Sequence, residues 1–247
     1  MVATRVAGAA RKRACLGMES TVTANPTPRL AVIVLPLRLG GNGLDLAYVA
    51  NGPASGLISA APLQDEPLDE AAVRLSQELV GRPPQYVEQL YTFDAQPGSS
   101  RQVIVSYLAL FRHDTCEPPL KAGLQWSPVK EISLDSDVHR TVFDYALMRL
   151  KAKFGYTNIA FHLLPEQFTL SDLQQAYEQV LGHPVDKRNF RRRMSVSKVL
   201  VKTDALRRDG SHRPAALYRF VARDDQAAYL TPSWAAASLS PPNENDR

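Results

Sequence analysis

The apolar residues in the first half of the chain fall into strand-sized runs separated by polar turns. Two runs flank the turn Gly40-Gly41-Asn42-Gly43, and a glycine-rich turn between apolar runs predicts a β-hairpin. A second pair of runs is separated by a polar loop that contains Pro97-Gly98. The predicted strands are residues 30–39, 44–50, 86–93 and 102–111.

A helix is predicted between the two strand pairs, over residues 68–80. Its apolar residues Leu68, Ala72, Leu75 and Leu79 recur at helical spacing, which places them on one face. Strands that alternate with a helix in this way favour a layered fold in which the helix covers a sheet.

A long amphipathic helix is predicted over residues 137–153. Val138, Val142 and Ala146 begin an apolar stripe along it, so we expect this helix to bridge two domains. Gly155 is expected to end it.

Two shorter helices follow the bridging helix. Thr169 begins an N-terminal capping pattern, residues 170–181 carry one apolar face, and Gly182 marks the end of that helix. After a short turn, Asp186 is expected to cap a third helix that runs to about Lys198.

The third helix has two unlike faces. At about 100° per residue, Phe190 and Met194 point to one side, and Arg188, Arg191, Arg192 and Ser195 point to the other. Strands at residues 199–202 and 217–221 follow, joined by a basic loop that Pro214 should stiffen. Helix, turn, helix and a two-stranded wing is the winged variant of the helix-turn-helix.

Positive charge is concentrated in this second region. Residues 186–213 hold ten Lys and Arg against three Asp, a net charge of +7, while the whole chain carries +4. A compact basic module can neutralise phosphates and release counterions, which indicates a nucleic-acid partner. A basic helix that is merely solvated is the alternative, but the flanking helix and wing favour the interpretation that this region binds nucleic acid.

Size and composition fit a two-domain protein of the cytoplasm. The 247 residues are 45% hydrophobic, yet no apolar run approaches the length of a membrane helix, so no membrane partner is expected. Cys15 and Cys116 suggest neither a disulfide framework nor a metal site. The predicted division is a disordered extension (1–27), a ligand-sensing domain (28–135), a winged-helix domain (136–222) and a disordered tail (223–247).

The predicted helix at residues 68–80 resembles the box of the Nudix family. Glu66, Arg74, Glu78 and Gly81 agree with the family pattern, whereas Ala60, Leu75 and Leu79 replace a glycine and two glutamates. In active members the glutamates present carboxylates to Mg²⁺, a hard cation that prefers oxygen ligands. One carboxylate between two leucines is a poor magnesium site, so we expect no catalytic residue, no metal and no cofactor.

The whole arrangement resembles the Nudix-related transcriptional regulators (NrtR). The resemblance is carried by NIAFHLLPEQFTL at 158–170, DKRNFRR at 186–192, YVEQLYTF at 86–93 and VSYLAL at 105–110. It implies an α+β fold, with a Nudix-like α/β/α sandwich on a mixed sheet followed by a winged helix-turn-helix domain. It also implies a homodimer that binds a double-stranded operator and senses a small effector, such as ADP-ribose or another NAD-related or sugar-related metabolite.

The expected function is therefore a metabolite-responsive transcriptional repressor. Arg101 is a candidate phosphate contact for the effector and Phe93 a candidate stacking partner, although both also fit ordinary surface and core roles. Two alternatives remain: a Nudix hydrolase of a nucleoside diphosphate derivative, and a first domain that serves only as a dimerisation scaffold. The candidate DNA-binding residues are Lys187, Arg188, Asn189, Arg191, Arg192, Arg193, Ser195 and Arg213.

Overall fold

The computed structural model describes residues 27–50, 55–96, 100–112, 119–208 and 214–221. The predictions for both termini, for the two cysteines and for Arg213 lie wholly or almost wholly outside these residues. Within the described part of the chain, no helix is long and apolar enough to cross a membrane.

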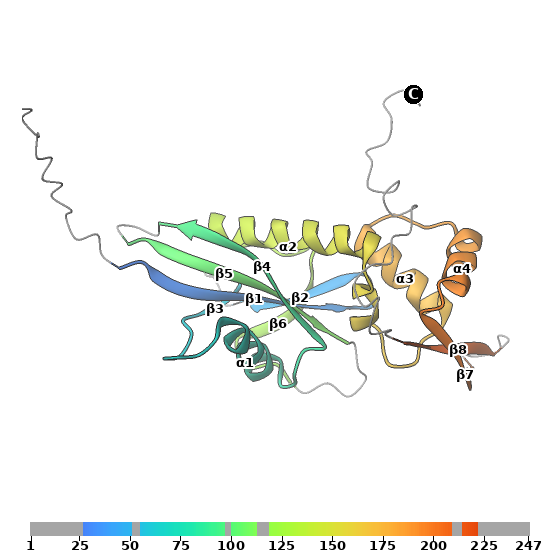
Figure 1. Ribbon diagram of the computed structural model, residues 1–247. Coiled ribbons are helices and arrows are strands. Elements are labelled where there is room, and N and C mark those ends of the chain that lie inside the picture. The colour runs from blue at the N-terminus through green and yellow to red at the C-terminus, as the bar shows by residue number, and fades with distance from the viewer. Residues whose placement is uncertain (1–26, 51–54, 97–99, 113–118, 209–213, 222–247) are drawn as a thin grey trace, which may run out of the picture.

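A mixed sheet forms the first part of the molecule (Figure 1). Strands run in the order β4-β5-β1-β2-β6, and β3 pairs with β1; β1 and β5 are parallel, and the other pairs are antiparallel. The predicted hairpin is confirmed, because Leu39 pairs with Leu44 across the glycine-rich turn. The strands are β1 (Arg29–Leu39), β2 (Leu44–Val49), β3 (Ile58–Ala60), β4 (Tyr86–Ala95), β5 (Gln102–Phe111) and β6 (Leu124–Pro128).

Both faces of the sheet are covered. Val32 and Val34 of β1 pack toward α1 (Leu68–Val80), while the alternate residues Ile33 and Leu35 belong to the core under α2 (Asp137–Tyr156). Figure 1 shows the two helices on opposite sides. A strand buried on both faces reads as a continuous apolar run, which explains the pattern of residues 30–39.

The helix α2 connects the sheet with the second part of the molecule. Its residues Val142 and Leu150 are fully buried in one core cluster that continues from the sheet into the winged helix. The prediction that this helix ends at Gly155 is wrong, because Gly155 is a buried position inside the helix. The helix instead continues to Tyr156, and the backbone N–H of Thr157 donates to the Lys153 carbonyl at 2.8 Å.

The winged helix lies at one end of the sheet (Figure 1). Two of its helices begin where their capping residues predict, since Thr169 and Asp172 form a reciprocal capping box and Asp186 accepts from the Asn189 N–H at 2.7 Å. Gly182 ends α3 with a φ of 83°, a conformation that favours glycine. The elements are η1 (Ile159–His162), α3 (Leu170–Leu181), α4 (Lys187–Val196), β7 (Leu200–Arg207) and β8 (Ala215–Phe220).

Candidate nucleic-acid interface and effector pocket

The helix α4 is fixed to the rest of the molecule by two apolar side chains. Phe190 and Met194 are 3% and 2% exposed. Phe190 meets the ring of Tyr177 edge-on at 5.3 Å, and Tyr177 meets Phe154 of α2 in the same way at 5.2 Å. This chain of rings joins α2, α3 and α4 through direct packing contacts.

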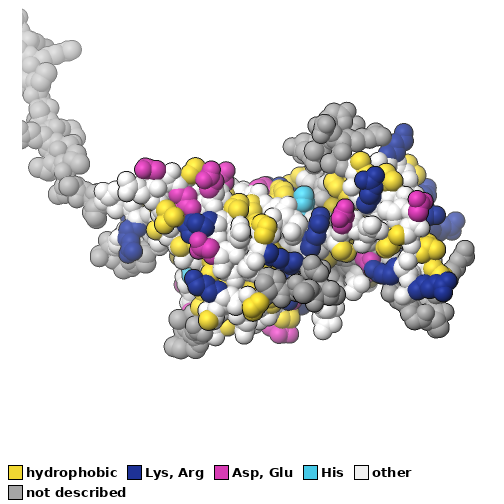
Figure 2. All heavy atoms as spheres, turned by 90° about the horizontal axis from the view of Figure 1, so that it is seen from below, with side chains coloured by type: hydrophobic (Ala, Val, Ile, Leu, Met, Phe, Trp, Pro, Cys, Tyr) yellow, Lys and Arg dark blue, Asp and Glu magenta, His cyan; other side chains and the backbone are white. Residues whose placement is uncertain are grey.

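The opposite face of α4 is basic and open to solvent. Arg188, Arg191 and Arg192 are exposed, and so are Lys187 and Ser195. The winged-helix end, at the right of Figure 2, carries several Lys and Arg side chains. The predicted division of the helix into an apolar inner face and a basic outer face is therefore confirmed.

Asn189 and Arg193, which are also predicted to contact DNA, are only half exposed. The Asn189 side-chain oxygen accepts from Arg192 at 3.3 Å and from Arg193 Nε at 3.1 Å. Asn189 thus orients neighbouring arginines. Arg191 in turn donates to Ser171 Oγ at 3.1 Å, which ties the basic face to the start of α3.

A pocket of about 1180 Å³ lies between α1 and β4 in the first part of the molecule. Arg74 and Glu78 stand in its wall. No local pattern of residues predicts this pocket, because its two walls come from segments that only the folded sheet brings together. Its lining residues are Leu68, Asp69, Glu70, Val73, Arg74, Gln77, Glu78, Gly81, Val87, Glu88, Gln89 and Tyr107.

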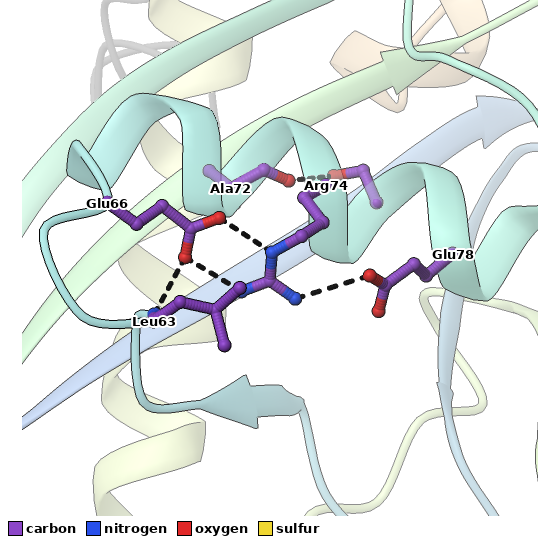
Figure 3. A network of polar contacts seen from close by, with 6 residues as sticks. Leu63, Glu66, Ala72, Arg74 and Glu78 are labelled. Atoms are coloured by element: carbon purple, nitrogen blue, oxygen red, sulfur yellow. Dashed lines mark hydrogen bonds and ion pairs between the residues drawn. The ribbon is translucent and has the colours of Figure 1, made fainter.

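Three of the four matching residues of the Nudix-like box, Glu66, Arg74 and Glu78, form one polar network. Figure 3 shows the Arg74 guanidinium between the carboxylates of Glu66 and Glu78. Arg74 donates to Glu66 at 2.6 and 2.9 Å, and Glu66 also accepts from the Leu63 N–H. The hydrogen bonds from Arg74 and Leu63 lower the pKa of Glu66 to about 2. Glu66 therefore stays ionised at neutral pH and fastens the loop before α1 to the helix.

The substituted box positions do not fit a magnesium ion. Leu75 is 6% exposed and belongs to the core, and Leu79 is half-buried. Glu78 pairs with Arg74 at 3.4 Å. Among the described residues, no group of three His, Cys, Asp or Glu side chains could hold a metal ion.

Arg101 and Phe93 do not line this pocket. Arg101 precedes β5, is exposed, and forms a 2.7 Å ion pair with Asp94. Phe93 packs edge-on against Tyr91 and Tyr145, with ring centroids 5.2 and 5.9 Å away. The two predicted contacts lie near each other at the end of β4, apart from the Arg74 network.

A polar cluster on β4 connects the pocket wall with α2. The Glu88 carboxylate accepts hydrogen bonds from the Tyr86 hydroxyl and from the Lys153 ammonium group, and Arg149 lies 3.9 Å away. The Tyr86 ring packs on His162 of η1, with centroids 4.8 Å apart. Since residues 87–89 line the pocket, one strand touches the pocket, α2 and the start of the winged helix.

We expect acid to destabilise this junction through His162. Burial lowers the pKa of His162, the charge of Arg112 acts in the same direction, and a hydrogen bond with the Gln85 backbone opposes them. The unfolded state binds the proton more tightly, so stability falls as the pH drops below the unfolded-state value of about 6.5. Urea unfolding at pH 7.5 and 5.5 should show a larger loss of stability for the wild type than for His162→Gln. Equal losses would contradict this assignment.

Comparisons with known proteins agree with both parts of the structure. Residues 160–220 match the model of the NrtR DNA-binding winged helix domain. The ADPR responsive transcriptional repressor NtrR of Acinetobacter baylyi is 34% identical over 167 residues, which are 65% of this chain and 66% of that protein. A MutT/nudix family protein from Enterococcus faecalis shares the fold, with a TM-score of 0.59 at 17% identity over 78% of this chain and 86% of its own.

A solved structure of Shewanella oneidensis NrtR, complexed with a 27mer DNA, superposes on both parts with a TM-score of 0.70. It is 28% identical and covers 81% of this chain and 99% of its own. A match over 81% of this chain takes in both the sheet and the winged helix. With a Nudix-like sheet domain followed by this winged helix, the chain belongs to the NrtR family of transcriptional regulators.

Proposed function

We propose that this protein is a metabolite-responsive transcriptional repressor that binds double-stranded DNA through α4 and binds ADP-ribose in its Nudix-like domain. The observation that carries the proposal is the exposed arginine face of α4, held outward by the buried Phe190 and Met194. The Acinetobacter relative, an ADPR responsive repressor by name, supports the effector, and the DNA complex of the Shewanella protein supports the partner.

The helix α4 is proposed to enter the major groove. An arginine presents a planar fork that can pair with guanine or clamp a phosphate, so Arg188, Arg191 and Arg192 are suited to both tasks. Lys187, Arg193 and Ser195 would hold the flanking backbone, and Asn189 orients the arginines. Arg213 of the wing, outside the described residues, is proposed to contact the backbone nearby.

We propose that residues 28–135 bind the effector and that residues 136–222 bind DNA. The α1–β4 pocket is large enough for a dinucleotide-sized metabolite and offers Arg74 to a phosphate. Glu66 and Glu78 already pair with Arg74, so an anionic ligand must compete with them or approach from the open side of the guanidinium. Arg101 and Phe93, at the end of β4, remain a second proposed location.

A catalytic role is not part of the proposal. Hydrolysis of a diphosphate in a Nudix enzyme needs carboxylates on Mg²⁺, and the residues present do not supply them, because Leu75 is in the core and Glu78 is paired with Arg74. Incubation with ADP-ribose and Mg²⁺ should leave the compound intact. Turnover that Glu78→Gln abolishes would instead favour a hydrolase.

The proposed signal passes along β4. A ligand seated against residues 87–89 bears on the strand whose Glu88 holds Lys153 of α2, and α2 carries the ring chain that positions α4. Two winged helices of a dimer must match the spacing of two operator half-sites, so a small change of their relative placement weakens binding. The ligand must prefer one dimer geometry over the other for this to happen.

Fluorescence anisotropy on a labelled duplex from the gene's own upstream region tests this function. The protein should bind that duplex more tightly than a scrambled duplex at moderate salt, and ADP-ribose should raise the apparent Kd. Gln77→Ala in the pocket and Arg101→Ala at the second location then show where the effector binds, because only the variant at the true site loses the response. Equal binding of the two duplexes would overturn the proposal.

A further inference from the structure

The start of α3 contacts both the helix α4 and the wing, which is formed by β7 and β8. Arg207 at the end of β7 donates two hydrogen bonds of 2.8 Å to the two carboxylate oxygens of Asp172. Asp172 also accepts the Thr169 N–H at 2.8 Å within the capping box. One carboxylate therefore holds both the first turn of α3 and the far end of a wing strand.

Two further contacts converge on the same turn. Ser171, the neighbour of Asp172, accepts a hydrogen bond from Arg191 of α4 at 3.1 Å. Phe168 exchanges a pair of backbone hydrogen bonds with Tyr218 of β8, at 3.0 and 2.8 Å. The helix α4 and both strands of the wing therefore all contact residues 168–172.

The Arg207–Asp172 pair has the geometry of a strong interaction. Its two parallel N–H···O bonds fix the guanidinium plane relative to the carboxylate, which a single bond or a lysine would not do. The side chains are 39% and 23% exposed, so solvent screens the pair only in part. Burial of Asp172 opposes ionisation, but the hydrogen bonds from Arg207 and Thr169 outweigh it and lower the pKa of Asp172.

We propose that the Asp172–Arg207 ion pair is a positioning device that sets the angle of the wing relative to α4, and that Arg207 acts on operator affinity through Asp172 rather than by touching DNA. This inference rests on the DNA-binding function proposed above. At the start of β7, strand pairs such as Leu200 with Phe220 hold β7 against β8. The register between the two strands then becomes irregular between Lys202 and Leu206. Arg207 lies beyond this irregularity and attaches the end of β7 to Asp172 of α3.

The opposite possibility is that Arg207 is a phosphate contact that Asp172 partly neutralises. The two ideas predict opposite signs for Asp172→Asn. The asparagine oxygen still accepts the Thr169 N–H, but the second oxygen and the charge that grip Arg207 are lost. A positioning role predicts weaker operator binding, by roughly fivefold or more, whereas removal of a neutralising charge predicts tighter binding to every duplex.

Matched variants control for charge alone. Asp204→Asn removes the same charge from an exposed site on β7, and Arg219→Lys makes the arginine-to-lysine change at an exposed site on β8. Arg207→Lys keeps the positive charge and loses the bidentate geometry, so it covers the case in which Asp172→Asn fails to fold. Each variant is titrated by anisotropy against the operator and a scrambled duplex, with circular dichroism as the folding check.

The positioning role predicts that Asp172→Asn and Arg207→Lys each weaken operator binding and leave binding to the scrambled duplex unchanged. The double variant should be no weaker than either single variant, because both remove one interaction. Tighter binding by Asp172→Asn, or equal losses on both duplexes by Arg207→Lys, would overturn the inference. If the wild type itself binds no duplex, the proposed function fails, and that outcome is separate.

Discussion

Replacing Arg188, Arg191 and Arg192 together by alanine should weaken operator binding by roughly a hundredfold or more, the largest functional effect we expect from any surface change. Each arginine that reads a base or clamps a phosphate contributes on the order of 1–3 kcal/mol to binding. All three are exposed on one face of α4, so their loss leaves the buried anchors of the helix untouched.

The salt dependence of binding separates the roles of these arginines. The slope of log K against log salt should become shallower by about 0.9 for each arginine that touches a phosphate. The control removes the same charge outside residues 136–222, at the exposed residues Arg29, Lys121 and Lys130. Anisotropy titrations at several salt concentrations measure both effects. Equal losses in the two triple variants would mean that general charge, and not the face of α4, governs the affinity.

Phe190→Ala should lower the free energy of unfolding by about 3–5 kcal/mol, the largest effect on stability among the residues of α4. A phenylalanine that is 3% exposed leaves a large cavity when it is truncated, and the cost combines lost burial with unfilled space. Urea unfolding followed by far-ultraviolet circular dichroism measures the change.

The control lies on the same helix. Val196 is 71% exposed, so Val196→Ala should change the free energy of unfolding by less than about 0.5 kcal/mol. A small effect of Phe190→Ala would show that the ring chain through Tyr177 and Phe154 does not support α4. It would also remove the physical link that we propose between the bridging helix and the DNA-binding face.

The winged helix was predictable because its signals are local. Thr169, Asp172 and Asp186 cap their helices from within a few residues, and the period of Phe190 and Met194 orients α4 without knowledge of its neighbours. The longer strands were predictable for the same reason, since their apolar runs are bounded by turns. The predicted end of α2 was wrong because burial of Gly155, a tertiary property, overrode the usual meaning of a glycine after an apolar stripe.

The features that the sequence did not predict depend on distant partners. The strands β3 and β6 are short, and pairing with β1 and β2 defines them. The pocket wall joins α1 to β4, and the Glu88–Lys153 contact spans 65 positions along the chain. The Asp172–Arg207 pair spans 35 positions, and neither residue stands out from other charged residues of the second domain. The spacing of residues along the chain carries no information about contacts between such distant segments.

Directed cleavage of the operator tests most directly the central claim that the exposed face of α4 lies in the DNA groove. A hydroxyl-radical-generating iron chelate is attached to a cysteine that replaces the exposed Ser195, with Cys15 and Cys116 changed to serine. The account predicts cleavage centred on each operator half-site, and none from the same chelate at Thr141, an exposed position on α2. An uncut operator in a complex that still shifts on a gel, or equal cutting from both positions, would contradict it.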